Sequence, residues 1–309
     1  MQTSRPMPLV SVYIPTKNRI ELLKRAIDSV LSQSYPSIEI VVVDDNSTDG
    51  TRDYLEALSK TSRVLPVFMP VSVGACIARN LAIKAASGHF VTGLDDDDYF
   101  EPDRIQTFVQ RWHALSGAEA RIAALFDGIQ VLRTSRLDRT ASPQRADRDK
   151  LKIHNAVGNQ AFAPRDHLIG AGLFDSSMPC WQDWDLWLRM AKMYGQFINC
   201  GNSSYVLDLK STSDRISTQP GFVIRYGLKR FRMKHGPYSL RESARILGAL
   251  CDYPQVKLSV WELALLAGSF QLPALARKLA QLLLPQSFYS RLRNRYAAVS
   301  ARTADTLGS

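Results

Sequence analysis

The sequence has few cysteines, and none of them lies close to another. Cys76, Cys180, Cys200 and Cys251 are the only four in 309 residues, and no C-x-x-C pair occurs. Zinc sites and disulfide frameworks usually place cysteines at short, regular spacings, so neither is indicated. A reducing compartment is therefore expected.

Long hydrophobic runs are also lacking. Residues 1–6 have no apolar core of a signal peptide and lead directly into an expected strand, which argues against secretion. No stretch reaches the roughly 18–20 apolar residues of a membrane span. The longest uncharged run near the C-terminus, 263–276, contains Pro273 and predicts a core or interfacial helix. We therefore expect a cytoplasmic globular protein.

Three common enzyme motifs are missing. No G-x-G-x-x-G or G-x-x-x-x-G-K-[S/T] pattern follows an expected strand, which disfavours a dinucleotide site and a P-loop. No G-x-S-x-G pattern occurs, which disfavours an α/β-hydrolase.

The first 131 residues alternate between strand and helix patterns. The segment 40–43 is a continuous β-branched run, typical of a strand buried on both faces. The segment 19–32 has apolar residues at helical spacing. The alternation predicts a doubly wound, mostly parallel α/β sheet. The expected strands are 9–14, 40–43, 64–69, 89–94 and 122–131, and the expected helices are 19–32, one ending at 58, 75–86 and one beginning at 102.

Positive charge is concentrated at the C-terminal end. Residues 221–309 contain 14 Lys/Arg and 4 Asp/Glu, which accounts for the whole net charge of +10. We therefore divide the chain into a domain of 1–215, with halves 1–131 and 151–215, and a basic helical region of 216–309. The segment 133–150 is charged and almost without apolar residues, so we expect a mobile loop or linker there.

Four consecutive aspartates, Asp95 to Asp98, follow the fourth expected strand. Ionised carboxylates repel one another and are costly to bury, so the run is either a solvated acidic turn or a site for a cation. Mg²⁺ and Mn²⁺ prefer carboxylate oxygens. In doubly wound sheets ligands bind beyond the carboxyl ends of the strands. The segments 15–18 and 44–46 also follow strands, so we expect all three to converge on one edge.

Five segments resemble family 2 glycosyltransferases of the GT-A fold and occur in that family's order. They are 10–19 (VSVYIPTKNR), 43–51 (VDDNSTDGT), 74–80 (GACIARN), 94–104 (LDDDDYFEPDR) and 181–189 (WQDWDLWLR). The resemblance covers 9 to about 210. It implies a nucleotide-diphospho-sugar donor (a UDP- or dTDP-sugar), a divalent Mn²⁺ or Mg²⁺ ion and inversion at the anomeric carbon.

The resemblance also implies roles for individual residues. Asp183 corresponds to the catalytic base and Asp97 to the metal ligand. Asp96 takes the variable middle position of the family's D-x-D pattern, and Asp98 supports the loop. The other donor-site residues are Pro15, Thr16 and Arg19 for the nucleoside, Asp44 for the pyrimidine, Arg79 for the base or diphosphate, and Asp95 for the ribose or the metal shell.

Each of these roles has a structural alternative. Asp44 can simply belong to a turn, and Arg79 can be an ordinary surface arginine. Asp183 can cap the helix that follows it, because acidic groups are favoured at helix N-termini. Asp185 competes with Asp183 for the role of base. The tryptophans Trp181, Trp184 and Trp187 line an apolar cleft or belong to the core.

The expected acceptor is a glycan or lipid-linked glycan of lipopolysaccharide, capsule or exopolysaccharide. Basic and aromatic residues at 222–238 and 288–296 suit an anionic membrane surface on the inner face of the cell membrane. They also suit nucleic acid, but this rival leaves the carboxylate motifs unexplained. A second rival is another sugar-nucleotide enzyme. Many relatives carry a histidine after the last strand; 207–213 has none, and Lys210 is the candidate replacement.

Overall fold

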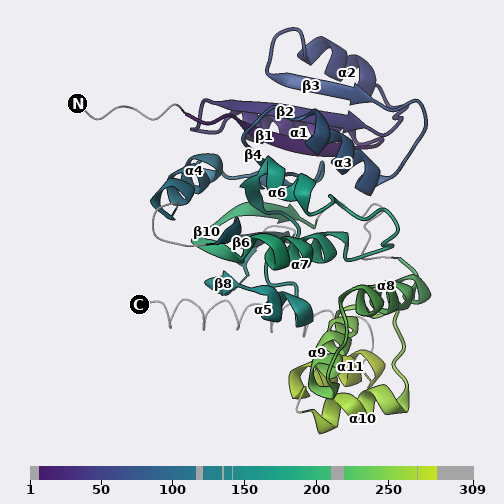
Figure 1. The fold of residues 1–309 in the computed structure, drawn as a ribbon. Helices are drawn as coiled ribbons and strands as arrows, with labels where there is room; N and C mark the ends of the chain where they lie inside the picture. Colours follow the sequence, from purple (N-terminus) through teal and green to yellow (C-terminus); the bar gives the residue numbers. More distant parts are fainter. Residues whose placement is uncertain are drawn as a thin grey trace.

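The computed structural model describes residues 7–115, 121–133, 136–140, 142–209, 219–269 and 271–283. The described strands form one ten-stranded sheet, ordered β3-β2-β1-β4-β9-β6-β10-β5, with β7 on β6 and β8 on β10. Figure 1 shows the N-terminal half in purple and blue at one end and the C-terminal helices in green and yellow at the other.

The elements are β1 Val10–Thr16, α1 Ile20–Leu31, β2 Ile38–Asp44, α2 Thr51–Leu58, β3 Val64–Phe68, α3 Ala75–Ala85, β4 Phe90–Gly93, β5 Tyr99–Phe100, α4 Arg104–Leu115, β6 Ile122–Arg133, β7 Arg136–Arg139, β8 Arg145–Ala146, α5 Arg148–Ile153, β9 Phe162–Pro164, α6 Arg165–Gly170, α7 Gln182–Tyr194, β10 Gln196–Asp208, α8 Gly221–His235, α9 Leu240–Gly248, the 3₁₀ helix η2 Ala249–Asp252, α10 Val260–Gly268 and α11 Leu272–Leu283.

The N-terminal strands β1 to β4 are parallel, and β1, β2 and β4 are buried on both faces, whereas the edge strand β3 is partly exposed. Val12 and Ile14 face a core covered by α1 and α4, whereas the intervening Tyr13 faces the core that contains α3 and α7. Alternate residues of a strand point to opposite faces, so helices on both faces leave no polar side for the sheet. The predicted α/β class and double winding are confirmed.

The second half of the sheet departs from the parallel pattern. β9 runs antiparallel between β4 and β6, and β5 pairs antiparallel with β10. The prediction of a loop or linker at 133–150 is wrong, because β7 pairs with β6 and β8 pairs with β10 there. Edge strands expose much of their surface, so they need no apolar alternation to form.

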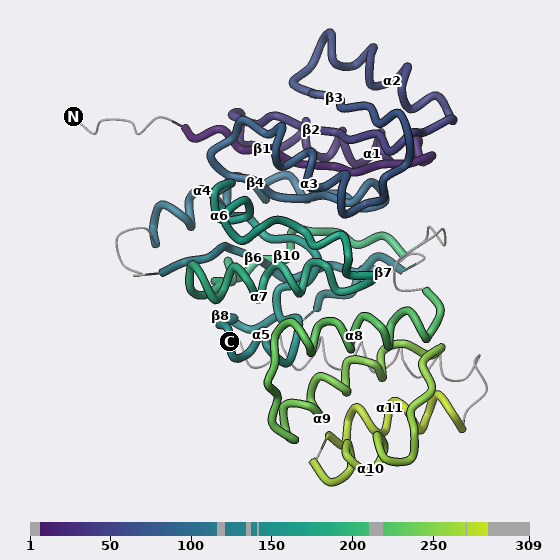
Figure 2. The backbone as a smooth tube through the Cα atoms, turned by 45° about the vertical axis from the view of Figure 1, so that its right-hand side comes forward, coloured from purple at the N-terminus to yellow at the C-terminus, as the bar shows by residue number. Residues whose placement is uncertain are grey.

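The C-terminal helices pack against α7 and the second half of the sheet instead of standing apart. Ile224 and Phe231 of α8, Leu250 of η2 and Leu266 of α10 belong to the same buried cluster as Trp184 of α7. Figure 2 shows α8 beside the layer that contains α7, with α9 to α11 beyond it. The boundary predicted at 215/216 lies outside the described residues. No described helix is long and apolar enough to cross a membrane.

A buried ion pair fixes α4 against the strands of the second half. The Arg104 guanidinium lies 2.7 Å from the Asp127 carboxylate, and their side chains are 1% and 3% exposed. Asp127 also accepts the Ser204 backbone N–H at 2.9 Å. The pair therefore joins α4, β6 and β10. β10 in turn contacts the run of four aspartates, because its Tyr205 hydroxyl donates to Asp98.

Replacement of Arg104 by alanine should lower the free energy of unfolding by about 3–5 kcal/mol, because it leaves the Asp127 charge buried without its cation. Urea unfolding followed by circular dichroism measures the loss. Arg52→Ala is the matched control: its pair with Glu56 is more than half exposed on both sides and should contribute at most about 1 kcal/mol. Equal losses in the two variants would contradict this assignment.

Candidate active site

The aspartate run lies where β4 ends, and its first two carboxylates are held by side chains from three other segments. Asp95 accepts from the Arg79 guanidinium of α3 at 2.7 Å and from the Asn159 amide at 3.2 Å. Asp96 accepts from the Thr16 hydroxyl at 2.8 Å and from Arg19 at 3.0 Å. The structure thus brings the predicted Thr16, Arg19 and Arg79 against the run.

The last two aspartates face β10 and the start of α1. Asp98 is fully buried, and it accepts from the Tyr205 hydroxyl at 2.7 Å and from the Asp208 backbone N–H at 2.9 Å. The Asp97 carboxylate lies 3.4 Å from Arg19, and its backbone carbonyl accepts from Arg25 at 2.6 Å. Asp98 therefore supports the loop, as the resemblance implied.

The protein's own cations do not fully compensate this concentration of charge. Burial raises the pKa of Asp96 to about 6, although Arg19 and Thr16 act in the opposite direction. Burial also raises the pKa of Asp98, and the charges of Asp95 and Asp97 add to the effect. Carboxylates that are unfavourably charged in this way are suited to an additional cation.

The predicted role of Asp97 as ligand of such a cation stays a prediction. Within the described ranges no group of three or more His, Cys, Asp or Glu side chains could hold a metal ion alone. Mg²⁺ is usually bound through one or two carboxylates together with substrate phosphates. An aspartate run without a complete set of protein ligands is consistent with a metal ion that is bound jointly by the protein and by substrate phosphates.

The end of β2 supports both interpretations of Asp44. Its carboxylate accepts the Ser47 backbone N–H at 3.0 Å, which is a turn interaction. It is also the direct sheet neighbour of Thr16, and Pro15 pairs beside it with Val43. The nucleotide contacts of Asp44 and Pro15 stay predictions.

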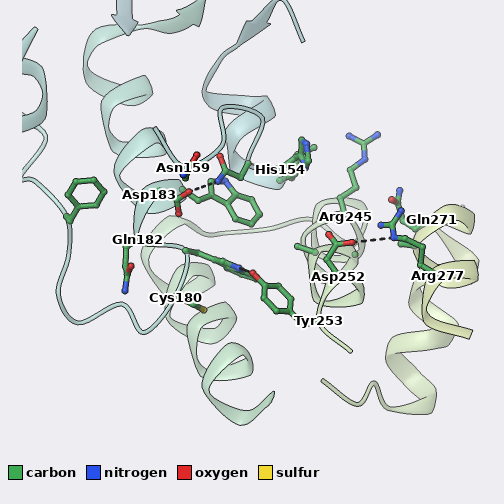
Figure 3. A pocket seen from close by; sticks show the side chains of 18 of the residues that line it. His154, Asn159, Cys180, Gln182, Asp183, Arg245, Asp252, Tyr253, Gln271 and Arg277 are labelled. Carbon is green, nitrogen blue, oxygen red and sulfur yellow. Dashed lines mark hydrogen bonds and ion pairs between the residues drawn. The ribbon is translucent and has the colours of Figure 1, made fainter. Parts of the chain in front are cut away.

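A cavity of about 680 Å³ lies between the sheet and the C-terminal helices. Of the predicted site residues, Arg79, Asp95 and Asp183 line it, whereas the other six do not. Figure 3 shows Asp183 and Asn159 on one side and Arg245, Asp252, Gln271 and Arg277 on the other. The first aspartate of the run and the predicted base therefore line the same cavity.

Asp183 lies in the first turn of α7, and its carboxylate accepts from the Asn155 amide at 3.0 Å. Burial raises its pKa, although the Asn155 amide and the nearby Arg79 oppose the shift. Trp181, two residues earlier, has φ of 59°, an uncommon conformation for a residue other than glycine that is concentrated at functional sites. A carboxylate that faces a cavity with a raised pKa is suited to accept a proton.

Asp185, the competing candidate, is committed to structural contacts. Its fully buried carboxylate binds Arg189 at 2.8 Å, Lys234 at 2.9 Å and His235 at 2.8 Å. Hydrogen bonding to His235 and the charge of Arg189 outweigh burial and lower its pKa to about 2. Asp185 thus joins α7 to α8, and Asp183 remains the candidate base.

The tryptophans divide between the two roles considered from sequence. Trp187 is fully buried in the core. Trp181 and Trp184 line the cavity, and the Trp181 indole N–H donates to the Tyr253 hydroxyl at 2.9 Å. Sequence reasoning missed Asn155 and Tyr253, because a lone amide and a lone phenol at these positions form no recognisable pattern.

Comparison with known proteins identifies the family. The sequence pattern described as "Glycosyl transferase family 2" matches residues 11–169. The chain is 33% identical over 220 residues to WcaA of Escherichia coli K12, a glycosyl transferase named for colanic acid biosynthesis; the match covers 69% of this chain and 77% of WcaA. The chain belongs to glycosyl transferase family 2. A shorter match, 42% identical over 100 residues, covers 32% of this glycosyltransferase and 40% of TuaG of Bacillus subtilis, a protein named for teichuronic acid biosynthesis.

Solved structures confirm the GT-A fold of this glycosyltransferase. Staphylococcus aureus TarS 1–349 in complex with UDP-GlcNAc is similar with a TM-score of 0.56 and 16% identity, over 85% of this chain and 71% of that one. The mannosyltransferase PcManGT of Pyrobaculum calidifontis, in complex with GDP-Man and Mn²⁺, is similar with a TM-score of 0.53 and 20% identity. The match covers 98% of this chain and 84% of PcManGT.

The basic residues of α8 in this glycosyltransferase are largely used within the chain. Arg225 pairs with Glu262 at 2.8 Å, Arg230 donates to Ser177 and Lys234 binds Asp175 and Asp185. The positive charge of the helix thus attaches it to its neighbours. Lys210 and the second basic cluster at 288–296 lie outside the described residues.

Asp185→Asn should destabilise this glycosyltransferase by about 2–4 kcal/mol at pH 7. The folded pKa of Asp185 is depressed to about 2 from an unfolded value near 3.9. Its contribution is therefore fully present above about pH 4 and lost as the pH falls through about 2. Urea unfolding at pH 7 and at pH 3 measures this dependence. Exposed Asp53→Asn is the control, expected within about 0.5 kcal/mol; a pH-independent loss would count against the ion network.

Proposed function

We propose that this chain is an inverting, metal-dependent glycosyltransferase that moves a hexosyl or deoxyhexosyl group from a nucleotide-diphospho-sugar to a glycan hydroxyl. The observation that carries the proposal is the single cavity that holds Asp183 beside Asp95 and Arg79. A candidate base that lines one cavity with the first aspartate of the run supports this proposal. The similar proteins TarS and PcManGT, in complex with UDP-GlcNAc and GDP-Man, support a nucleotide-sugar donor.

The donor is proposed to bind along the carboxyl ends of β1, β2 and β4. Pro15, Thr16, Arg19 and Asp44 supply the nucleoside side, and Arg79, Asp95 and Asp96 supply polar contacts toward the ribose and diphosphate. Asp97 would hold a Mn²⁺ or Mg²⁺ ion. When bound, this ion supplies positive charge that stabilises the leaving nucleoside diphosphate.

Asp183 is proposed to act as the only base. Its carboxylate takes the proton from the acceptor hydroxyl, whose oxygen forms a bond to the anomeric carbon. The bond from that carbon to the phosphate oxygen breaks on the opposite face, and the nucleoside diphosphate leaves. One displacement inverts the configuration and needs no second carboxylate as general acid.

We propose a bacterial cell-envelope polysaccharide, either lipopolysaccharide or an exported polysaccharide, as the product to which this transfer contributes. The names of WcaA and TuaG, for colanic and teichuronic acid biosynthesis, support it. A cytoplasmic location with peripheral contact to an anionic membrane surface is part of the proposal. Phe222, Met233 and Trp261, which are 75%, 76% and 85% exposed in the C-terminal helices, support this contact better than the internally paired basic residues do.

Asp183→Asn should lower the turnover number by about 10²–10⁴-fold and leave nucleotide binding intact, because the amide keeps the shape but cannot accept the proton. Release of nucleoside diphosphate from a panel of UDP-, dTDP- and GDP-sugars with Mn²⁺ measures turnover, and thermal shift measures binding. Asp53→Asn is the surface control. Full turnover in Asp183→Asn would refute the assignment of the base.

Asp97→Asn should instead weaken Mn²⁺-dependent nucleotide binding, which the same thermal-shift measurement detects.

Asn155→Ala should move the acid limb of the pH–rate profile to higher pH. The Asn155 amide stabilises the charged form of Asp183, so its loss raises the pKa of the base further, and the base is active only when deprotonated. Initial rates between pH 5 and 9 test this shift. A rate reduced equally at every pH would indicate instead that Asn155 only shapes its loop.

A further inference from the structure

The wall of the cavity opposite Asp183 is built by helices that lie beyond the segment matched by the family. Arg245 of α9, Asp252 of η2 and Arg277 of α11 line it, whereas the match to the family ends at residue 169. None of these residues has a place in the donor site or in the proton transfer described above. They need a separate explanation.

This wall carries more positive than negative charge. Arg277 forms an ion pair with Asp252 at 3.4 Å, and the two side chains are 47% and 64% exposed, respectively. Arg245 is exposed, and within the described part of the chain its side chain has no hydrogen bond or ion pair. Figure 3 shows its side chain extending from the helix on the same side as Asp252 and Arg277. Two guanidinium groups therefore face the cavity with one carboxylate between them.

The helices that carry these groups are firmly held. A capping box of Ser239 and Glu242 begins α9. α11 is fixed to η2 because Gln281 donates to the Cys251 carbonyl at 2.7 Å and Lys278 donates to the Tyr253 carbonyl at 3.2 Å. The two arginines thus extend from a preformed wall, which lowers the entropic cost of binding a ligand.

The same wall is linked to the segment that carries the base. Tyr253 follows Asp252 directly and accepts from Trp181, two residues before Asp183. This contact fixes the aromatic floor of the cavity between the arginines and the base. Asp183, Trp181 and Arg245 all line this cavity, so a molecule within it has access to both the candidate base and the arginine.

We propose that Arg245 and Arg277 form an acceptor subsite for an anionic group, a phosphate or a carboxylate, attached to the sugar whose hydroxyl reaches Asp183. Planar guanidinium groups bind both anions through paired, charge-assisted hydrogen bonds. His154, which also lines the cavity, supplies a further polar contact. This subsite rests on the proposed function, because Asp183 defines which end of the acceptor reacts.

Isothermal titration calorimetry on the protein saturated with Mn²⁺ and the best-bound nucleoside diphosphate tests the subsite. The probes are phenyl phosphate, geranyl diphosphate and methyl glucuronide. Wild-type protein should bind at least one of them, and Arg245→Gln and the double variant with Arg277→Gln should weaken that binding about tenfold or more. Arg241→Gln is the matched control, because Arg241 is exposed on the same helix and does not line the cavity.

The source of the anion follows from the order of the affinities. Tightest binding of geranyl diphosphate indicates a lipid-diphosphate acceptor, and tightest binding of methyl glucuronide indicates an acidic sugar. The subsite is refuted if the wild type binds the Mn²⁺–nucleotide complex but none of the anions. It is also refuted if Arg245→Gln binds the anions as tightly as Arg241→Gln does. Neither result contradicts the proposed function. If no Mn²⁺-dependent nucleotide binding occurs, the proposed function itself fails.

Discussion

The concentration of four carboxylates at the end of β4 is the constraint on which the site depends. Like charges so close together remain in a buried loop only if other parts of the chain bring compensating groups to them. Arg79 arrives from α3, Arg19 from the start of α1 and Tyr205 from β10. The loop is therefore contacted by three separate elements, which come from both halves of the sheet.

A second acidic centre shows how neighbouring residues of the same type take different roles. Asp183 and Asp185 lie two positions apart on α7, yet one faces the cavity and the other faces the contact with α8. Cations and a histidine lower the pKa of Asp185, whereas burial raises that of Asp183. The difference in environment, set by helical geometry, separates a structural carboxylate from a candidate catalytic one.

Sequence predicted the N-terminal sheet well because its central strands β1, β2 and β4 are buried on both faces, so their apolar patterns are continuous and strong. The rule that ligands bind at the carboxyl ends of strands correctly placed Thr16, Asp44 and the aspartate run at one edge. The short strands β7 and β8 escaped prediction because edge strands need no apolar alternation. The far wall of the cavity was not predicted either, because the sequence around Arg245 or Arg277 does not indicate that α9 and α11 pack against the rest of the fold.

The contact between Trp181 and Tyr253 has a functional consequence. It joins the segment that carries the candidate base to the C-terminal helices, and both lie beyond residues 11–169, which the family pattern matches. Substitutions on α9 and α11 can change the chemical character of the far wall while the aspartate run, Asp183 and its support remain as they are. On the proposed function, a change confined to this wall would alter which acceptor is elongated and leave the groups proposed for donor binding and proton transfer as they are.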